Sequence, residues 1–255
     1  MSTTIAVSGK GGSGKTTLAA MIIRYLCEQD KGAVLAVDAD PNCCLGLTIG
    51  VEPEEVIAEI REKAAEKSPS SPGMDRVRSF EYGIQQAITE GSGFDLVTMG
   101  RPEGPGCYCA ANNLLRQFLD KLSGAYSYVV MDNEAGMEHI SRLTTDNVDV
   151  LLVISDPSIR GIETAGRISS LVDELKVRVV ERFLIINQAR DGLADSLQEA
   201  IVKHGLNLAG TIPRDDLLYD FDMKGNPTIN LPDDNPAVSA AFDIFDRIIE
   251  VKATA

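Results

Sequence analysis

A glycine-rich loop near the start of the chain, residues 9–16 with the sequence GKGGSGKT, constrains the fold more than any other segment. It fits the phosphate-loop pattern G-x-x-x-x-G-K-[ST]. The apolar run Ile5–Ser8 before it predicts a strand, and Thr17–Ile23 after it predicts the start of a helix. In this context backbone N–H groups turn inward around a phosphate, and the helix N-terminus adds a partial positive charge. We therefore expect a bound nucleotide phosphate rather than a ligand-free strand–helix turn.

The residues of this loop have separate expected tasks. Lys15 is expected to reach the β- and γ-phosphates of a nucleotide, and the Thr16 hydroxyl to bind Mg²⁺. Backbone contacts to the phosphates complete the set, and they are expected from Gly11, Gly12, Ser13, Gly14 and Thr17.

Composition narrows the class of protein and its partners. The 255 residues carry a formal charge of −14, and the densest basic spot is only Arg76-Val77-Arg78. Such a chain is repelled by nucleic acid and by anionic lipid, so we expect neither as a partner. No apolar run approaches the length of a membrane span, and no signal peptide precedes the first strand. With five cysteines, an odd number, the chain is expected to be cytoplasmic.

Strand-like apolar runs alternate with helical stretches through most of the chain. This alternation predicts an α/β fold with a doubly wound, mostly parallel sheet and helices on both faces. We expect one domain over residues 1–255, with a charged and then Ser/Pro-rich excursion at Glu52–Ser79. Helices are expected at Ile162–Leu175 and Ser196–His204. The expected strands are Ile5–Ser8, Ala33–Asp38, Phe94–Met99, Tyr128–Asp132, Val150–Ser155, Phe183–Asn187 and Leu208–Ile212.

Acidic residues close two of these strands. Asp38 ends the second strand and Asp40 follows it in the order D-x-D-P, and Asp132 ends the run Tyr128–Asp132 before Gly136. Carboxyl ends of parallel strands lie beside the phosphate loop, so these carboxylates are expected near the γ-phosphate and its Mg²⁺. Alternatively, Asp-Pro-Asn is an ordinary way to turn the chain. Glu134 lies in the same loop as Asp132, and the sequence leaves open whether it is catalytic or merely exposed.

A cysteine pair, Cys107 and Cys109, lies in the segment GPGCYC. Thiolates are soft ligands suited to Zn²⁺, Ni²⁺ or Cu⁺. Two thiolates make half of a four-coordinate site, and a symmetric dimer would supply the other half. Two small loop residues or a redox pair remain alternatives for the same pattern.

The second lysine in the phosphate loop, Lys10, makes the sequence KGGSGKT similar to the deviant Walker A (SIMIBI) ATPases, which include MinD, ParA and the nitrogenase iron protein. The resemblance implies an ATP-dependent homodimer in which Lys10 reaches the partner's nucleotide. It also implies that Asp40 positions the attacking water, and that Asp38 and Asp132 hold the magnesium shell. Asn187 ends a strand with an amide suited to adenine. The segment around Pro213 resembles the I-P-x-D stretch of the MinD group that lies against the base.

Together with D-x-D-P, the segment G-P-G-C-Y-C-x-x-N resembles the CooC/AcsF family. These are accessory ATPases that assist nickel insertion into carbon monoxide dehydrogenase or acetyl-CoA synthase. The resemblance implies ATP and ADP as nucleotides, nickel at Cys107 and Cys109 between subunits, and one of those enzymes as client. The residues alone would equally admit zinc.

Two other functions remain open. One is a ParA/MinD-like positioning switch, although Asp243–Ala255 lacks the basic amphipathic helix of MinD. The other is an ATPase with an intersubunit iron–sulfur cluster. The nitrogenase iron protein has a cysteine just after its Walker B strand, whereas Asn133–Ile140 has none. Of the remaining thiols, Cys27 is expected in the core, and packing is favoured over accessory metal binding for Cys43 and Cys44.

Overall fold

The computed structural model describes residues 2–66, 83, 86–101, 115–116, 119, 122, 124–135, 147–175, 177–190 and 192–249. The second half of the expected excursion and the Cys107/Cys109 segment lie outside these residues.

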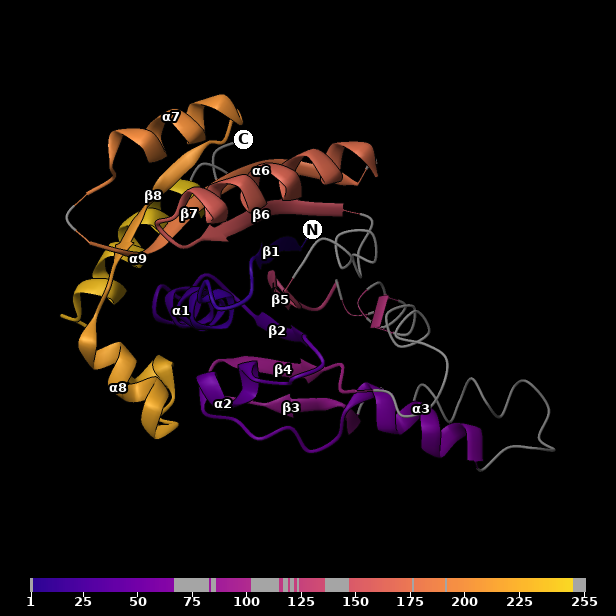
Figure 1. Ribbon diagram of the computed structural model, residues 1–255. Helices are drawn as coiled ribbons and strands as arrows, with labels where there is room; N and C mark the ends of the chain where they lie inside the picture. Colours follow the sequence, from indigo (N-terminus) through magenta and orange to yellow (C-terminus); the bar gives the residue numbers. More distant parts are fainter. Residues whose placement is uncertain are drawn as a thin grey trace.

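One eight-stranded sheet organises the described chain, in the order β3-β4-β2-β5-β1-β6-β7-β8 (Figure 1). Every neighbouring pair is parallel except β3 and β4. Parallel pairing places the carboxyl ends of the other strands at one edge of the sheet, where ligands of doubly wound folds bind. The strands are β1 (Thr3–Gly9), β2 (Val34–Ala39), β3 (Ile88–Glu90), β4 (Phe94–Thr98), β5 (Tyr128–Asn133), β6 (Asn147–Ser155), β7 (Arg178–Ala189) and β8 (Leu208–Pro213).

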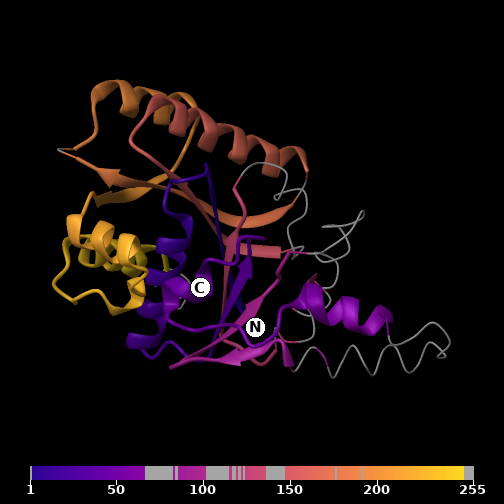
Figure 2. The same ribbon diagram turned by 60° about the horizontal axis from the view of Figure 1, so that its bottom comes forward.

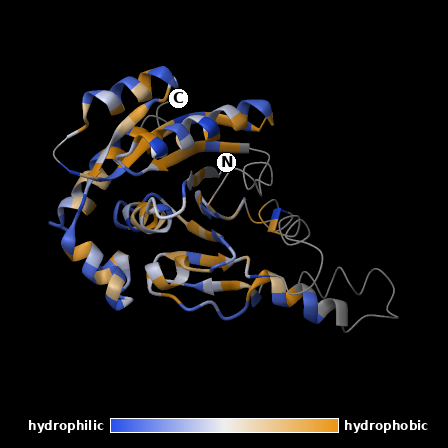
Figure 3. Ribbon diagram, in the orientation of Figure 1, coloured by the Kyte–Doolittle hydropathy of each residue, from blue (hydrophilic) through white to orange (hydrophobic). Residues whose placement is uncertain are grey.

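Helices cover both faces of the sheet, because successive strand residues point to opposite sides. In β1, Ile5 and Val7 pack into the core beneath α1 and α9, whereas Ala6 packs beneath α6 and α7. Figures 1 and 2 show these layers, and Figure 3 shows apolar colour along the strands. The helices are α1 (Lys15–Glu28), α2 (Leu45–Ile49), α3 (Ile57–Glu66), α6 (Ile159–Glu174), α7 (Asp195–Lys203), α8 (Asp216–Lys224) and α9 (Pro236–Ile249), with a short 3₁₀ turn η2 (Thr228–Asn230).

The predicted fold class is confirmed, and all seven expected strands are present with shifted ends. The largest shift is in β7, which begins at Arg178 rather than Phe183, because its first half is only partly buried and lacks a continuous apolar run. The antiparallel strand β3 was not expected. It has only three residues, too few to show a period-two pattern.

Candidate nucleotide-binding site

The phosphate loop joins β1 to α1 and leaves the helix N-terminus open. Gly14 precedes α1 with φ +90° and provides no side-chain cap. A side chain there would be strained and would also collide with Asn187, whose Nδ2 lies 2.2 Å from the position of a Cβ. Ser13 braces the loop instead, since its hydroxyl donates to the Lys10 carbonyl at 2.8 Å. Uncapped N–H groups at the start of a helix are suited to a phosphate.

Asp38 and Asp132 are paired neighbours in the sheet, at matching positions of β2 and β5. Both are fully buried. Burial, followed by the neighbouring Asp132 charge, raises the pKa of Asp38 to about 7. Burial also raises the pKa of Asp132 to about 6, while a hydrogen bond from Thr16 and the charge of Lys15 act in the opposite direction. Two buried carboxylates side by side favour either a shared proton or a bound cation.

The residues around Asp132 fit a magnesium ion. Asp132 Oδ1 is buried and has no hydrogen-bond partner, although Thr16 bonds the same side chain. An orphaned buried carboxylate oxygen is costly unless something binds it. Carboxylate and hydroxyl oxygens are the hard ligands that Mg²⁺ prefers. The donor set expected from the sequence, Thr16, Asp38 and Asp132, is therefore brought together by α1, β2 and β5.

Asp38 and Asp40 are placed by different parts of the backbone. Asp38 lies within β2, and its two carboxylate oxygens accept hydrogen bonds from the backbone N–H groups of Asp40 and Leu45. Because β2 ends at Ala39, strand alternation does not extend to Asp40. The Asp40 carboxylate accepts instead from Asn42, through both its backbone N–H and its Nδ2, each at 2.9 Å. Asp40 therefore lies in an Asp-Pro-Asn turn, which is the alternative that the sequence offered. Its charge is still close enough to raise the pKa of both Asp38 and Asp132.

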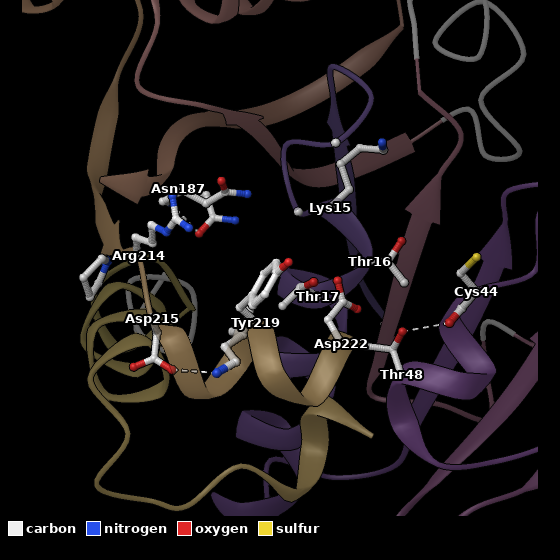
Figure 4. A pocket seen from close by; sticks show the side chains of 15 residues that line it. Lys15, Thr16, Thr17, Cys44, Thr48, Asn187, Arg214, Asp215, Tyr219 and Asp222 are labelled. Carbon is white, nitrogen blue, oxygen red and sulfur yellow. Dashed lines mark hydrogen bonds between the residues drawn. The ribbon is translucent and has the colours of Figure 1, made fainter. Parts of the chain in front are cut away.

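A cavity of about 520 Å³ opens beside the phosphate loop. Figure 4 shows side chains entering it from α1, α2, the ends of β7 and β8, and α8. Seven of its lining residues were expected from the sequence: Gly12, Gly14, Lys15, Thr16, Thr17, Asn187 and Pro213. The residues that sequence reasoning missed are Cys44, Thr48, Gln188, Leu218, Tyr219 and Asp222, whereas Arg214 and Asp215 belong to the I-P-x-D segment expected against the base.

Asn187 has a second role that the sequence did not indicate. Its Nδ2 donates to the backbone carbonyl of Ser13 at 2.9 Å, and its Oδ1 accepts from the backbone N–H of Gln188 at the same distance. Gln188 has φ +57°, which is uncommon for a residue other than glycine. The amide thus ties the end of β7 to the phosphate loop while still lining the cavity. Its expected contact with adenine stays a prediction.

Lys10 is held at the edge of the site by an ion pair. Its Nζ lies 3.2 Å from Oδ2 of Asp156, which follows β6. Both side chains are partly exposed, and such pairs contribute little to stability. Lys10 does not line the cavity, and breaking its ion pair would cost little.

Three of the five cysteines, Cys27, Cys43 and Cys44, lie within the residues that the structure describes. Cys27 packs against the core as expected, and burial raises the pKa of its thiol to about 11. The prediction that Cys44 is packed is wrong, because Cys44 is exposed and lines the cavity immediately before α2. Within the described residues no three His, Cys, Asp or Glu side chains form a metal cluster. Cys107 and Cys109 lie outside the described residues.

Comparison with known families agrees with this site. The model of the CobQ/CobB/MinD/ParA nucleotide binding domain matches residues 4–229. The chain belongs to this family of P-loop ATPases. As a family member it is a nucleotide-binding protein, and the loop, the two buried carboxylates and the cavity form its candidate nucleotide site. None of the described helices is long and apolar enough to cross a membrane.

Individual relatives are similar along nearly the whole chain. An uncharacterized ATP-binding protein of Methanocaldococcus jannaschii is 41% identical, covering 97% of this chain and 99% of that protein. The carbon monoxide dehydrogenase accessory protein CooC of Rhodospirillum rubrum is 31% identical, covering 87% of each chain. Among solved structures, the cell division ATPase MinD of Pyrococcus furiosus superposes with a TM-score of 0.72 at 19% identity, covering 98% of this chain and all of that one. At that identity the likeness supports the fold alone.

Proposed function

We propose that this family member is an ATP-hydrolysing homodimeric metallochaperone that assists nickel insertion into carbon monoxide dehydrogenase or acetyl-CoA synthase. One observation carries the proposal. The chain combines the two-lysine phosphate loop with the Cys107-x-Cys109 pair, and it is 31% identical to CooC over 87% of both chains. The proposal of ATP as substrate and nickel as cargo rests on that combination rather than on the fold.

Hydrolysis of ATP would use groups that the nucleotide site already presents. Lys15, nearly buried at the start of α1, would neutralise the β- and γ-phosphates. Mg²⁺, held by Thr16, Asp38 and Asp132, would supply charge neutralisation at the same oxygens when bound. Asp40, on the turn after β2, would orient the attacking water. Asn187 and Pro213 would hold the base end of the nucleotide.

Dimerisation would link the nucleotide to the cargo. Lys10 leaves Asp156 and reaches the phosphates of the partner's nucleotide, so that ATP favours one arrangement of the two subunits. A metal ion held by Cys107 and Cys109 of both chains requires the same two subunits. Anything that stabilises one arrangement then changes affinity at the other site, and the coupling is reciprocal. Nickel is the cargo implied by the resemblance to the CooC/AcsF family, while thiolates alone would also accept zinc.

A second candidate is an ATP-switched positioning protein. MinD of Bacillus subtilis is 25% identical over 96% of this chain. In that function the cysteines are incidental, and the formal charge of −14 is a disadvantage at anionic surfaces. The two candidate functions differ in whether the protein needs the thiols of Cys107 and Cys109 to act.

The experiment that separates them is activation of a nickel-free client. Purified nickel-free carbon monoxide dehydrogenase or acetyl-CoA synthase is incubated with limiting Ni²⁺, ATP and this protein. We expect faster recovery of client activity with wild type than with Lys15→Ala or Cys107→Ala/Cys109→Ala. Cys27→Ala, which alters a thiol packed against the core, is the matched control and should activate normally. Recovery that is unaffected by the double cysteine substitution would favour the positioning switch.

A further inference from the structure

Helix α8 is the least embedded of the described helices that line the nucleotide cavity. None of its residues is buried. Three of its large apolar side chains are exposed: Leu217 at 42%, Tyr219 at 55% and Met223 at 70%. Leu218 and Phe221 pack partly against the core and hold the helix in place. Figure 1 shows α8 at the periphery, beside α1 and α2. The exposed side chains are grouped on one short helix, which favours an interaction surface over scattered exposure.

The charge of this helix indicates what would cover it. α8 contains three aspartates and one lysine, and Lys224 is already paired with Asp220 at 3.3 Å. Asp216 and Asp222 remain as exposed acidic groups beside the apolar side chains. A complementary surface is therefore apolar with lysines or arginines around it. A second copy of this chain, at −14, and an anionic membrane both carry the wrong sign.

The same helix forms a wall of the nucleotide cavity. Leu218, Tyr219 and Asp222 line it from α8, and Asp215 caps the helix by accepting from the Leu218 N–H at 2.7 Å. The preceding residue, Arg214, donates its N–H to the Ala189 carbonyl at 2.9 Å. Two residues earlier in β7, Asn187 bonds Ser13 of the phosphate loop. A short series of contacts thus joins the phosphate loop to α8.

We propose that α8 is a docking helix for a partner protein that presents apolar side chains surrounded by lysine or arginine, and that docking depends on the nucleotide state. The docking surface consists of Leu217, Tyr219 and Met223 with Asp216. Its dependence on nucleotide rests on the proposed ATP site, because α8 has to settle against the base end of the cavity when ATP fills it. Docking itself requires only the exposed face.

The test uses a helical peptide of leucine and lysine as probe, with a leucine–glutamate peptide of the same pattern as its charge-reversed counterpart. Binding to the full chain is measured by fluorescence anisotropy, and the contact is located by hydrogen exchange. The test variant is Leu217→Ser/Met223→Ser, which leaves the cavity-lining residues unchanged. The matched control is Val180→Ser/Val202→Ser, which removes apolar side chains that are 57% and 78% exposed on β7 and α7. Thermal unfolding of each variant checks that it is folded.

We expect the leucine–lysine peptide to protect the backbone amides of residues 216–224 from hydrogen exchange. It should bind the α8 variant about tenfold more weakly than wild type, which corresponds to about 1.4 kcal/mol. It should bind the control variant as tightly as wild type. Asp216→Asn should weaken binding and reduce its salt dependence. Affinity should differ between the protein with ADP and with a non-hydrolysable ATP analogue. The proposal would be overturned if both double variants lost the same affinity for the leucine–lysine peptide, or if the peptide protected amides outside α8 from hydrogen exchange. Equal affinity for the leucine–glutamate and leucine–lysine peptides would also overturn it.

Other occupants give their own results. Self-association that disappears in the α8 variant, measured by light scattering, would identify a second copy and contradict the proposal. Binding to vesicles of anionic lipid that disappears in the same variant would identify a membrane and contradict it equally. If calorimetry detects no ADP or ATP binding, the proposed ATP function fails while the peptide result still decides whether α8 docks a partner.

Discussion

Lys10 and Asp156 form an ion pair across the ends of β1 and β6, with Nζ and Oδ2 3.2 Å apart. The two residues are distant in sequence and meet because Gly9 and Ile154 are register neighbours in the sheet. Asp156 also accepts a hydrogen bond from the Ser158 hydroxyl, which caps α6. The lysine that would bridge two subunits is thus held by its own chain before dimerisation.

Releasing or removing this lysine should change dimerisation in opposite directions. We expect Lys10→Ala to weaken ATP-induced dimerisation, because the partner's phosphates lose a cation. Asp156→Asn should strengthen it a few-fold, since breaking an exposed ion pair costs only about 0–1 kcal/mol. Lys63→Ala, which breaks another exposed ion pair, is the matched control. Light scattering with a non-hydrolysable ATP analogue measures the mass, and an unchanged mass in Lys10→Ala would count against the bridge.

Lys15 provides a direct test of the phosphate loop. Lys15→Ala should abolish ATP turnover, because the β- and γ-phosphates lose the cation supplied by the loop. A loss of roughly 10²-fold or more is expected for a group that stabilises transition-state charge. Phosphate release assays at saturating Mg²⁺ and ATP give the rate. Turnover at the wild-type rate would refute the assignment of this loop.

Asp40 should separate ATP binding from hydrolysis. Asp40→Ala is expected to bind ATP normally and to stop hydrolysis, because a water-positioning group acts in the transition state rather than in the ground state. The variant should therefore accumulate as the ATP-bound dimer. Single-turnover hydrolysis and equilibrium ATP binding are measured on the same preparation. Asn42→Ala, which removes the Nδ2 donor to Asp40 but keeps the backbone N–H donor and the carboxylate, tests whether the side-chain hydrogen bond is needed.

The buried pair Asp38 and Asp132 predicts how stability depends on pH. Their native pKa values, about 7 and about 6, lie above the value of about 3.9 for an unfolded aspartate. Between about pH 4 and pH 7 the native state then binds more protons than the unfolded state, so the free energy of unfolding falls as pH rises. We expect ligand-free protein to be less stable at pH 8 than at pH 5, and Mg²⁺ with nucleotide to reverse the loss.

Urea unfolding of wild type and Asp132→Asn at both pH values isolates this contribution. The variant shares the general repulsion of an acidic chain but lacks one of the paired charges. Between pH 5 and pH 8 the free energy of unfolding should fall by at least about 1 kcal/mol more in wild type than in the variant, since one pKa unit corresponds to about 1.4 kcal/mol. A parallel loss in both proteins would mean that Asp38 and Asp132 do not set the pH dependence.

Features near the carboxyl ends of strands could be predicted from the sequence. The glycines and Lys15 make the phosphate loop recognisable in the sequence, and continuous apolar runs indicate buried parallel strands. Once the strands are parallel, Asp38 and Asp132 must lie at the same edge, and their register in β2 and β5 makes them direct neighbours. Local pattern and topology agree at these positions, so prediction succeeds.

Features that depend on how separate segments meet could not be predicted. The pairing of Lys10 with Asp156 and of Asn187 with Ser13 joins residues more than a hundred positions apart. Tyr219 and Asp222 reach the cavity only because α8 stands beside it. A signal for that helix was present, since Asp215 followed by a mixed apolar and acidic run is a typical helix start. Its orientation toward the nucleotide cavity was not encoded in any local pattern.

Metal binding in two nucleotide states tests the central claim most directly. Anaerobically purified protein is titrated with Ni²⁺ in the presence of ADP and of a non-hydrolysable ATP analogue, and Cys107→Ala/Cys109→Ala is titrated in parallel. We predict one ion per dimer, an affinity that differs between the two nucleotides, and loss of this site in the double variant. One ion per monomer, equal affinity in both states, or binding that survives the substitution would contradict an ATP-dependent metallochaperone with its cargo between the subunits.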